Sequence, residues 1–215
     1  MASTRPSPAA APERALLLER AATALVHEGK NPLHNMVLHV QLLDEKVRDQ
    51  GQGVAPFERH LQALRDGIGR VDSLLRAFSD LAAPWNLEPD LGAAVSRAQL
   101  LFGHEARRGS VEVVQRGPAS VPVQAEAGML CDLVCHAYLA GVALARDGTL
   151  RVSVDTDGPR ARLELHAEGG APRREEAAPH LEAVRRLYSE AGAELSLDVS
   201  PAAPARLSLS FAHPR

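Results

Sequence analysis

Apolar residues recur every three or four positions along two N-terminal segments, and this spacing predicts two long helices. We expect the first helix over residues 13–48 and the second over 55–81, separated by the Gly- and Gln-containing stretch 49–53. Two long helices with a short link form an antiparallel hairpin. The expected apolar seam of the first helix consists of Leu18, Ala22, Leu25, Gly29, Leu33, Met36, Val40, Leu43 and Val47.

The second helix carries a matching stripe, and the hairpin cannot bury both stripes by itself. We therefore expect two copies of the chain to pair as a homodimer through a four-helix bundle. The residues of this second stripe are Phe57, Leu61, Leu64, Ile68, Val71, Leu75 and Phe78.

Beyond Pro84 the pattern changes to a mixture of helical and alternating segments. We expect an α+β chain, with a leader over 1–12 that its Ala, Pro and Ser content predicts to be disordered, a helical hairpin over 13–83 and an α/β-sandwich domain over 84–215. A hairpin turn is expected at 155–158. The remaining elements are predicted as helices at 91–107, 126–145 and 179–191, and strands at 111–114, 150–154, 161–166, 195–199 and 206–211.

Composition narrows the classes of protein that fit. A net charge of −3 and a pI near 6.3 give no electrostatic reason to expect nucleic-acid binding. No apolar run reaches the ~20 residues that span a bilayer, and no signal peptide is recognisable, so we expect a soluble cytoplasmic protein without membrane contact. Cys131 and Cys135 lie four residues apart in an apolar helical pattern, which indicates core thiols; we expect no metal site.

The stretch with the most specific chemistry is His27-Glu28-Gly29-Lys30-Asn31-Pro32-Leu33 in the first predicted helix. It resembles the phosphoacceptor box of bacterial two-component sensor histidine kinases, His-Glu-x-Arg/Lys-Asn/Thr-Pro-Leu. Helical spacing places Lys30, Asn31 and His34 on the face of His27, away from the predicted seam. The alternative is an exposed histidine without a role.

The resemblance implies a role for each polar residue of the box. His27 would be the phosphoacceptor, because an uncharged imidazole is a nucleophile near neutral pH. Glu28 would accept a proton or hydrogen bond from its ring, Lys30 would stabilise phosphate charge, and Asn31 would position water for hydrolysis of a receiver's phosphoaspartate. The alternatives are a solvated acid, a solvating lysine and a helix-surface amide.

The order of elements after residue 84 is similar to the ATP-binding domain of histidine kinases, but the nucleotide positions depart from that family. The helix 130–137 matches the family pattern Leu-x-Asn-Leu-Leu-x-Asn-Ala, with Asp132 and His136 in place of its two asparagines. In the family the second asparagine coordinates the magnesium of ATP. Neutral imidazole is a poor ligand for magnesium, which prefers oxygen.

Two further departures fall in the same expected pocket. Ala167 stands where the family's Asp-x-Gly-x-Gly motif has the aspartate that binds adenine; Gly169 is retained and Ala171 replaces the last glycine. The stretch 178–181, which includes His180, has none of the glycines of the family's phosphate loop. Together these changes predict that no ATP or other cofactor is bound.

An intact acceptor box beside a degenerate nucleotide site resembles the dimeric histidine phosphotransferases that descend from kinases. The expected function is a phosphorelay between receiver-domain aspartates through His27, without autokinase activity and without a fused sensor, transmembrane or receiver segment. The implied partners are response-regulator receiver domains, a hybrid histidine kinase, or both. Two alternatives are an active histidine kinase with a divergent ATP pocket and a non-catalytic scaffold or inhibitor of a two-component system.

Overall fold

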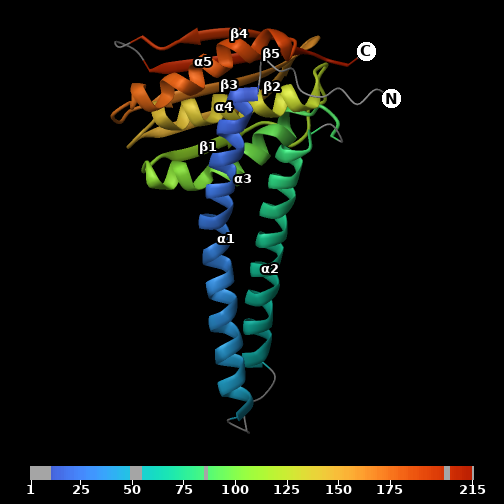
Figure 1. Ribbon diagram of the computed structural model, residues 1–215, viewed down its shortest axis with the longest axis vertical. Helices are drawn as coiled ribbons and strands as arrows, with labels where there is room; N and C mark the ends of the chain where they lie inside the picture. The colour runs from blue at the N-terminus through green and yellow to red at the C-terminus, as the bar shows by residue number, and fades with distance from the viewer. Residues whose placement is uncertain (1–10, 49–54, 85–86, 201–203, 215) are drawn as a thin grey trace.

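The computed structural model describes residues 11–48, 55–84, 87–200 and 204–214. A long helical hairpin made of α1 (Ala11–Arg48) and α2 (Ala55–Ala82) extends from a mixed α/β domain (Figure 1). The α+β fold class expected from the sequence is confirmed. The predicted break at 49–53 and most of the predicted leader lie outside the described residues, but α1 already begins at Ala11, two residues earlier than expected.

The hairpin is held by side chains that face each other across α1 and α2. Near the far end the Nδ1 atoms of His39 and His60 are 2.9 Å apart, and nearer the α/β domain Glu28 pairs with Arg70 at 3.2 Å. Helix α1 continues through Pro32, whose ring removes one backbone hydrogen bond but does not end the helix.

In a single chain, the predicted seam of α1 divides between a buried and an exposed face of the hairpin. Leu33 and Val40 were assigned to the seam but are 49% and 54% exposed, whereas Glu28 and Pro32 are buried. The exposed apolar residues form a second stripe on the outside of the hairpin, which a single copy leaves in solvent. Its members are Val26, Leu33, Val37, Leu38, Val40, Leu61, Ile68 and Leu75.

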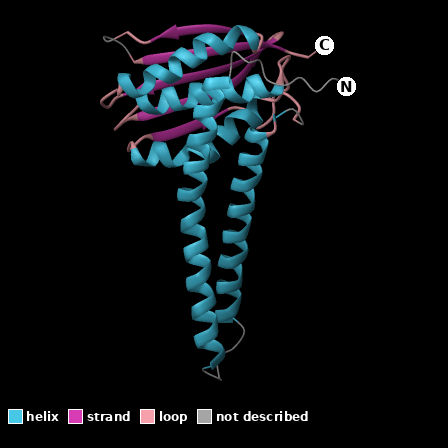
Figure 2. Ribbon diagram, in the orientation of Figure 1, coloured by secondary structure: helices cyan, strands magenta, loops and turns pink. Residues whose placement is uncertain are grey.

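A five-stranded sheet with strand order β1-β2-β3-β5-β4 forms the back of the α/β domain (Figure 2). Strands β1 and β2 are parallel and all other neighbours are antiparallel. The helices cover one face, and the opposite face is open. The elements are α3 (Leu91–Arg108), β1 (Glu112–Arg116), α4 (Ala127–Leu144), β2 (Thr149–Asp157), β3 (Arg160–Glu168), α5 (Arg174–Glu190), β4 (Ala193–Asp198) and β5 (Ala205–Ala212).

Helix α4 is the centre of the core, and nearly all of its residues are buried. It is 18 residues long and apolar enough to cross a membrane by length and composition, but 94% of that stretch is buried inside the protein, as in the core helix of a folded domain. Cys131 and Cys135 are free thiols buried on this helix, which confirms the expectation that they belong to the core.

Two predicted boundaries in the α/β domain are wrong. The turn expected at 155–158 lies further on, because β2 and β3 stay paired up to Asp157 and Arg160. Helix α5 begins at Arg174, five residues before the expected start at Pro179. Its first turn carries Glu175 and Glu176, which favour a helix N-terminus electrostatically, and Pro179 lies inside the helix.

The first turns of α1 belong to the core of the α/β domain. Leu17 and Ala21 are completely buried in the same apolar cluster as α3 and α4. Arg14 donates to both carboxylate oxygens of Asp132 on α4 at 2.9 Å and to the carbonyl of Leu81 at the end of α2. One helix therefore joins the hairpin and the α/β domain directly.

Candidate functional site

His27 lies on the exposed side of α1, where the hairpin meets the α/β domain. Its ring lies against that of His104 on α3, with ring centroids 6.1 Å apart and ring planes inclined by 21°. Within the described part of the chain, the His27 side chain makes no hydrogen bond or ion pair. A ring nitrogen of His27 is thus available to an incoming group.

Glu28 occupies a different environment from the one expected for it. It is only 6% exposed, so the alternative of a solvated acid is wrong. Its two carboxylate oxygens accept hydrogen bonds from two guanidinium groups, Arg70 of α2 and Arg107 of α3. The predicted contact with the His27 ring is not among the contacts of the described residues, because both oxygens are turned to these arginines.

The other polar residues of the box are exposed. Lys30 and Asn31 both face solvent, one turn along α1 from His27. Lys30 and His34 border an apolar hollow of about 600 Å³ between α1 and α2, which includes Leu33 and Val37. The roles expected for Lys30 and Asn31 in phosphate binding and water positioning stay predictions.

Asp132, at the first position that departs from the kinase pattern, is bound by another side chain of the same protein. It is 1% exposed and bound by both oxygens to Arg14. Burial raises the pKa of Asp132 to about 6, although the Arg14 guanidinium acts in the opposite direction. Its carboxylate is therefore a structural contact of α1.

His136, at the second asparagine position of the kinase pattern, and His180, in the stretch that matches the phosphate loop, contact each other. Their Nδ1 atoms are 2.9 Å apart, and the two residues are 0% and 1% exposed. Burial lowers the pKa of His136 to about 4 and that of His180 to about 3, so both rings are neutral at pH 7. One ring must donate its Nδ1–H to the other, which fixes complementary tautomers.

Ala167 and Gly169, which match the expected adenine-binding motif, lie at the end of β3 and directly after it. Ala167 is 5% exposed on the helix-covered face, and Glu168 points to the open face, where it pairs with Arg151 and His166. Because adjacent strand residues point to opposite faces, Glu168 does not replace the missing acceptor at 167. Gly169 follows with φ +69°, a left-handed conformation that suits glycine.

Little space remains beside these buried positions. The nearest hollow holds about 180 Å³ among α1, α3, α4 and α5, and Arg20, Glu105, Arg108, Arg146 and His180 line it. Pockets for drug-sized ligands and cofactors usually measure roughly 300–1,000 Å³. The hollow beside His180 is smaller than this range.

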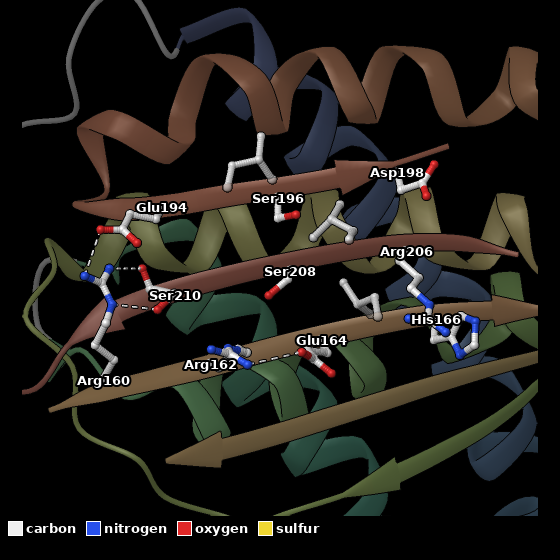
Figure 3. Close-up of a pocket in the computed structure, with 13 residues that line it drawn as sticks. Arg160, Arg162, Glu164, His166, Glu194, Ser196, Asp198, Arg206, Ser208 and Ser210 are labelled. Carbon is white, nitrogen blue, oxygen red and sulfur yellow. Dashed lines mark hydrogen bonds and ion pairs between the residues drawn. The ribbon is translucent and has the colours of Figure 1, made fainter. Parts of the chain in front are cut away.

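A larger groove of about 700 Å³ lies on the open face of the sheet (Figure 3). Ion pairs lie in it between Arg160 and Glu194 at 2.8 Å and between Arg162 and Glu164 at 3.6 Å. Because α1 packs on the helix-covered side, this groove is separate from His27.

Sequence reasoning missed His104, Arg107 and Arg14 as partners of the candidate residues. Only the contact between Asp132 and Arg14 had a recognisable signal in the sequence. Asp132 lies within a strongly apolar helix, and a carboxylate buried there requires a cation or a hydrogen-bond donor. The pairing of α3 with the acceptor box left no comparable mark in the sequence.

No protein-family model matches the chain, and no curated protein matches it. Among solved structures, it is similar to the histidine kinase AdeS of Acinetobacter baumannii (14% identity over 88% of this chain and 98% of that chain, TM-score 0.47). A structure described as a bacterial phosphotransferase shares 16% identity over 98% of this chain and 99% of that chain, with a TM-score of 0.46. The blue-light activated histidine kinase EL346 of Erythrobacter litoralis shares 21% identity over 76% and 64%, with a TM-score of 0.47. All three similarities are distant.

Proposed function

We propose that this chain is a histidine phosphotransfer protein of a two-component system. His27 accepts a phosphoryl group from the aspartyl phosphate of one receiver domain and passes it to the aspartate of another. The observation that carries this proposal is the complete box from His27 to Leu33, with His27 exposed on α1 and free of hydrogen bonds among the described residues.

The chemistry requires little from the chain besides an accessible imidazole. A ring nitrogen of His27 forms a bond to phosphorus while the bond from phosphorus to the aspartate oxygen breaks, and the bonding electrons stay with the carboxylate. The reverse step regenerates the imidazole and phosphorylates the second receiver. The metal ion that assists transfer belongs to the receiver's acidic pocket in this scheme.

The environment of the degenerate nucleotide positions supports transfer without ATP. Asp132 is engaged by Arg14, and His136 and His180 are neutral, buried and bound to each other. Phosphate must then come from a partner, either a receiver domain or a hybrid histidine kinase. We propose that this partner docks on the exposed side of α1 and α2 beside His27, through a weak and transient contact that allows release after transfer.

The outer apolar stripe of the hairpin supports a homodimer as the working form. A second copy could cover Val26, Val37 and Ile68, which are 57–68% exposed in one chain. A four-helix bundle formed in this way would present two His27 sites.

The decisive experiment offers the protein a panel of receiver domains carrying labelled phosphate. We expect acid-labile label to appear on the wild type and on His34→Gln, but not on His27→Gln. His34 is the matched control, because it is exposed on the same helix, seven residues further on. Label on His27→Gln would contradict the assignment, and label from γ-labelled ATP would establish a kinase instead.

A further inference from the structure

Helix α3 of the α/β domain meets the acceptor box at two adjacent positions. His104 lies against His27, and Arg107, one turn further along α3, binds Glu28. The pairing is regular, since residues three apart share one face of a helix. The α/β domain therefore contributes side chains to the surroundings of His27.

The role expected of Glu28 is left open by these contacts. When one nitrogen of His27 bonds to phosphorus, the ring becomes a cation until the proton on its other nitrogen leaves. A carboxylate with both oxygens bound to Arg70 and Arg107 is a poor acceptor for that proton. Water can take this proton from the exposed ring, but a base held beside His27 would speed the step.

His104 has the chemistry for this step. Its Nε2 lies 3.5 Å from a carboxylate oxygen of Glu105, and the hydrogen bond from His104 is the main reason that the pKa of Glu105 lies below its ordinary value. An Nε2–H that faces Glu105 leaves Nδ1 with a lone pair. This Nδ1 atom is buried and has no hydrogen-bond partner among the described residues. Buried polar atoms without partners are rare and are often functional.

We propose that His104 is the proton acceptor of the phosphotransfer site, an inference that rests on the proposed function of His27. As the nitrogen–phosphorus bond forms, the proton on the second ring nitrogen of His27 moves to Nδ1 of His104. His27 is left as a neutral phosphohistidine, and His104 becomes an imidazolium whose Nε2–H is held by Glu105. Return of the proton accompanies transfer to the next receiver. Glu105 is a positioning residue, because it acts through His104.

The distance to be closed is small. The two histidine pairs with Nδ1–Nδ1 contacts of 2.9 Å, His39–His60 and His136–His180, both have ring centroids 5.2 Å apart. The 6.1 Å separation of His27 and His104 exceeds this by about 0.9 Å, and their ring planes are inclined by 21°, compared with 54° and 42° in those two pairs. Rotation of the exposed His27 side chain must therefore accompany the approach, or one water must bridge the two rings.

The test compares His104→Ala with His166→Ala in the full-length chain. His166 is the matched control. Like His104, it pairs with a nearby glutamate (Glu168, at 3.1 Å) and has one buried ring nitrogen without a hydrogen-bond partner among the described residues. Unlike His104, it lies on the open face of the sheet (Figure 3). We expect His104→Ala to slow label transfer from a phosphorylated receiver to His27 by about a hundredfold, the lower range for loss of a general base. The receiver concentration that gives half the maximal rate should not change, and His166→Ala should transfer at the wild-type rate.

Chemical rescue separates proton transfer from a structural role. Added imidazole should restore part of the rate to His104→Ala, whereas pyrazole, a similar ring that is a much weaker base, should not. His104→Gln and Glu105→Gln give the same measurement if the alanine variant fails to fold; we expect a large and unrescued loss for the first and an intermediate loss for the second.

The two proposals fail in different ways. If wild-type His27 takes no label from any receiver, the proposed function falls and the role of His104 falls with it. If the wild type is labelled and His104→Ala is equally fast, or is slow without imidazole rescue, only the role of His104 is overturned.

Discussion

Replacing the buried histidine pair His136–His180 by leucines should remove a large acid sensitivity of the fold. Both rings are neutral in the folded chain, with pKa values of about 4 and about 3, whereas in the unfolded chain both titrate near 6.5. As the pH falls below 6.5, the unfolded chain therefore takes up protons that the folded chain does not. The stability that the neutral pair gives is complete above pH 6.5 and is lost progressively as the pH falls toward 4.

The size of the effect follows from these pKa values. At pH 5 each histidine lowers the free energy of unfolding by about 2 kcal/mol relative to pH 8, so the pair accounts for about 4 kcal/mol. Asp132 acts in the opposite direction: its pKa of about 6 in the folded chain lies above its ordinary 3.8, so it stabilises the fold by about 1 kcal/mol on the same change. The wild type should therefore lose about 3 kcal/mol between pH 8 and pH 5 from these three groups.

Urea unfolding followed by circular dichroism, at one fixed protein concentration, measures this difference. The stability of His136→Leu/His180→Leu relative to the wild type should rise by about 4 kcal/mol between pH 8 and pH 5. The single variant His180→Leu should show roughly half of this change. Equal pH dependence of the double variant and the wild type would refute the buried neutral pair.

Four further predictions address the contacts described above. Arg14→Met leaves Asp132 buried without a cation and should lower the free energy of unfolding by about 3 kcal/mol. The double variant Arg14→Met/Asp132→Leu should recover most of this stability, as measured by thermal or urea unfolding. Val26→Glu with Ile68→Glu should convert a dimeric mass in light scattering to a monomeric one without loss of helix content, and an unchanged dimer contradicts the bundle. Calorimetry at millimolar ATP with magnesium should detect no binding; an affinity in the micromolar range restores the kinase alternative. Asn31→Ala should reduce dephosphorylation of a receiver and leave labelling of His27 intact, and unchanged dephosphorylation removes Asn31 from the site.

Periodicity predicted the helices well, because each long helix here has one face in an apolar environment. The predicted α3 and α4 differ from the observed helices by one residue at each affected end. The predicted seam of α1 is not buried along its whole length in one chain, because this helix contacts α2, the α/β domain and solvent on different sides. Pro179 is predicted as the first residue of a helix but lies inside α5, whose buried residues offset the lost hydrogen bond and the steric conflict of the proline ring.

The candidate site was predictable only where it is local in sequence. The box from His27 to Leu33 is a continuous segment, and its place on an exposed helix follows from spacing. The contacts of Glu28 with Arg107 and of His27 with His104 join residues 79 and 77 positions apart, and they depend on how α3 packs against α1. Charged and aromatic residues on amphipathic helices have many possible partners, so composition alone could not select these.

The burial of Leu17 and Ala21 from α1 in the core of the α/β domain also has kinetic consequences for partner encounter. The two domains cannot swing apart without drawing these side chains into water, so a receiver of the proposed relay would meet a surface whose shape is set in advance. Such preorganisation lowers the conformational entropy lost on association. In the proposed relay, a few contacts would then suffice for recognition, and the complex could dissociate quickly enough for one copy to serve successive receivers.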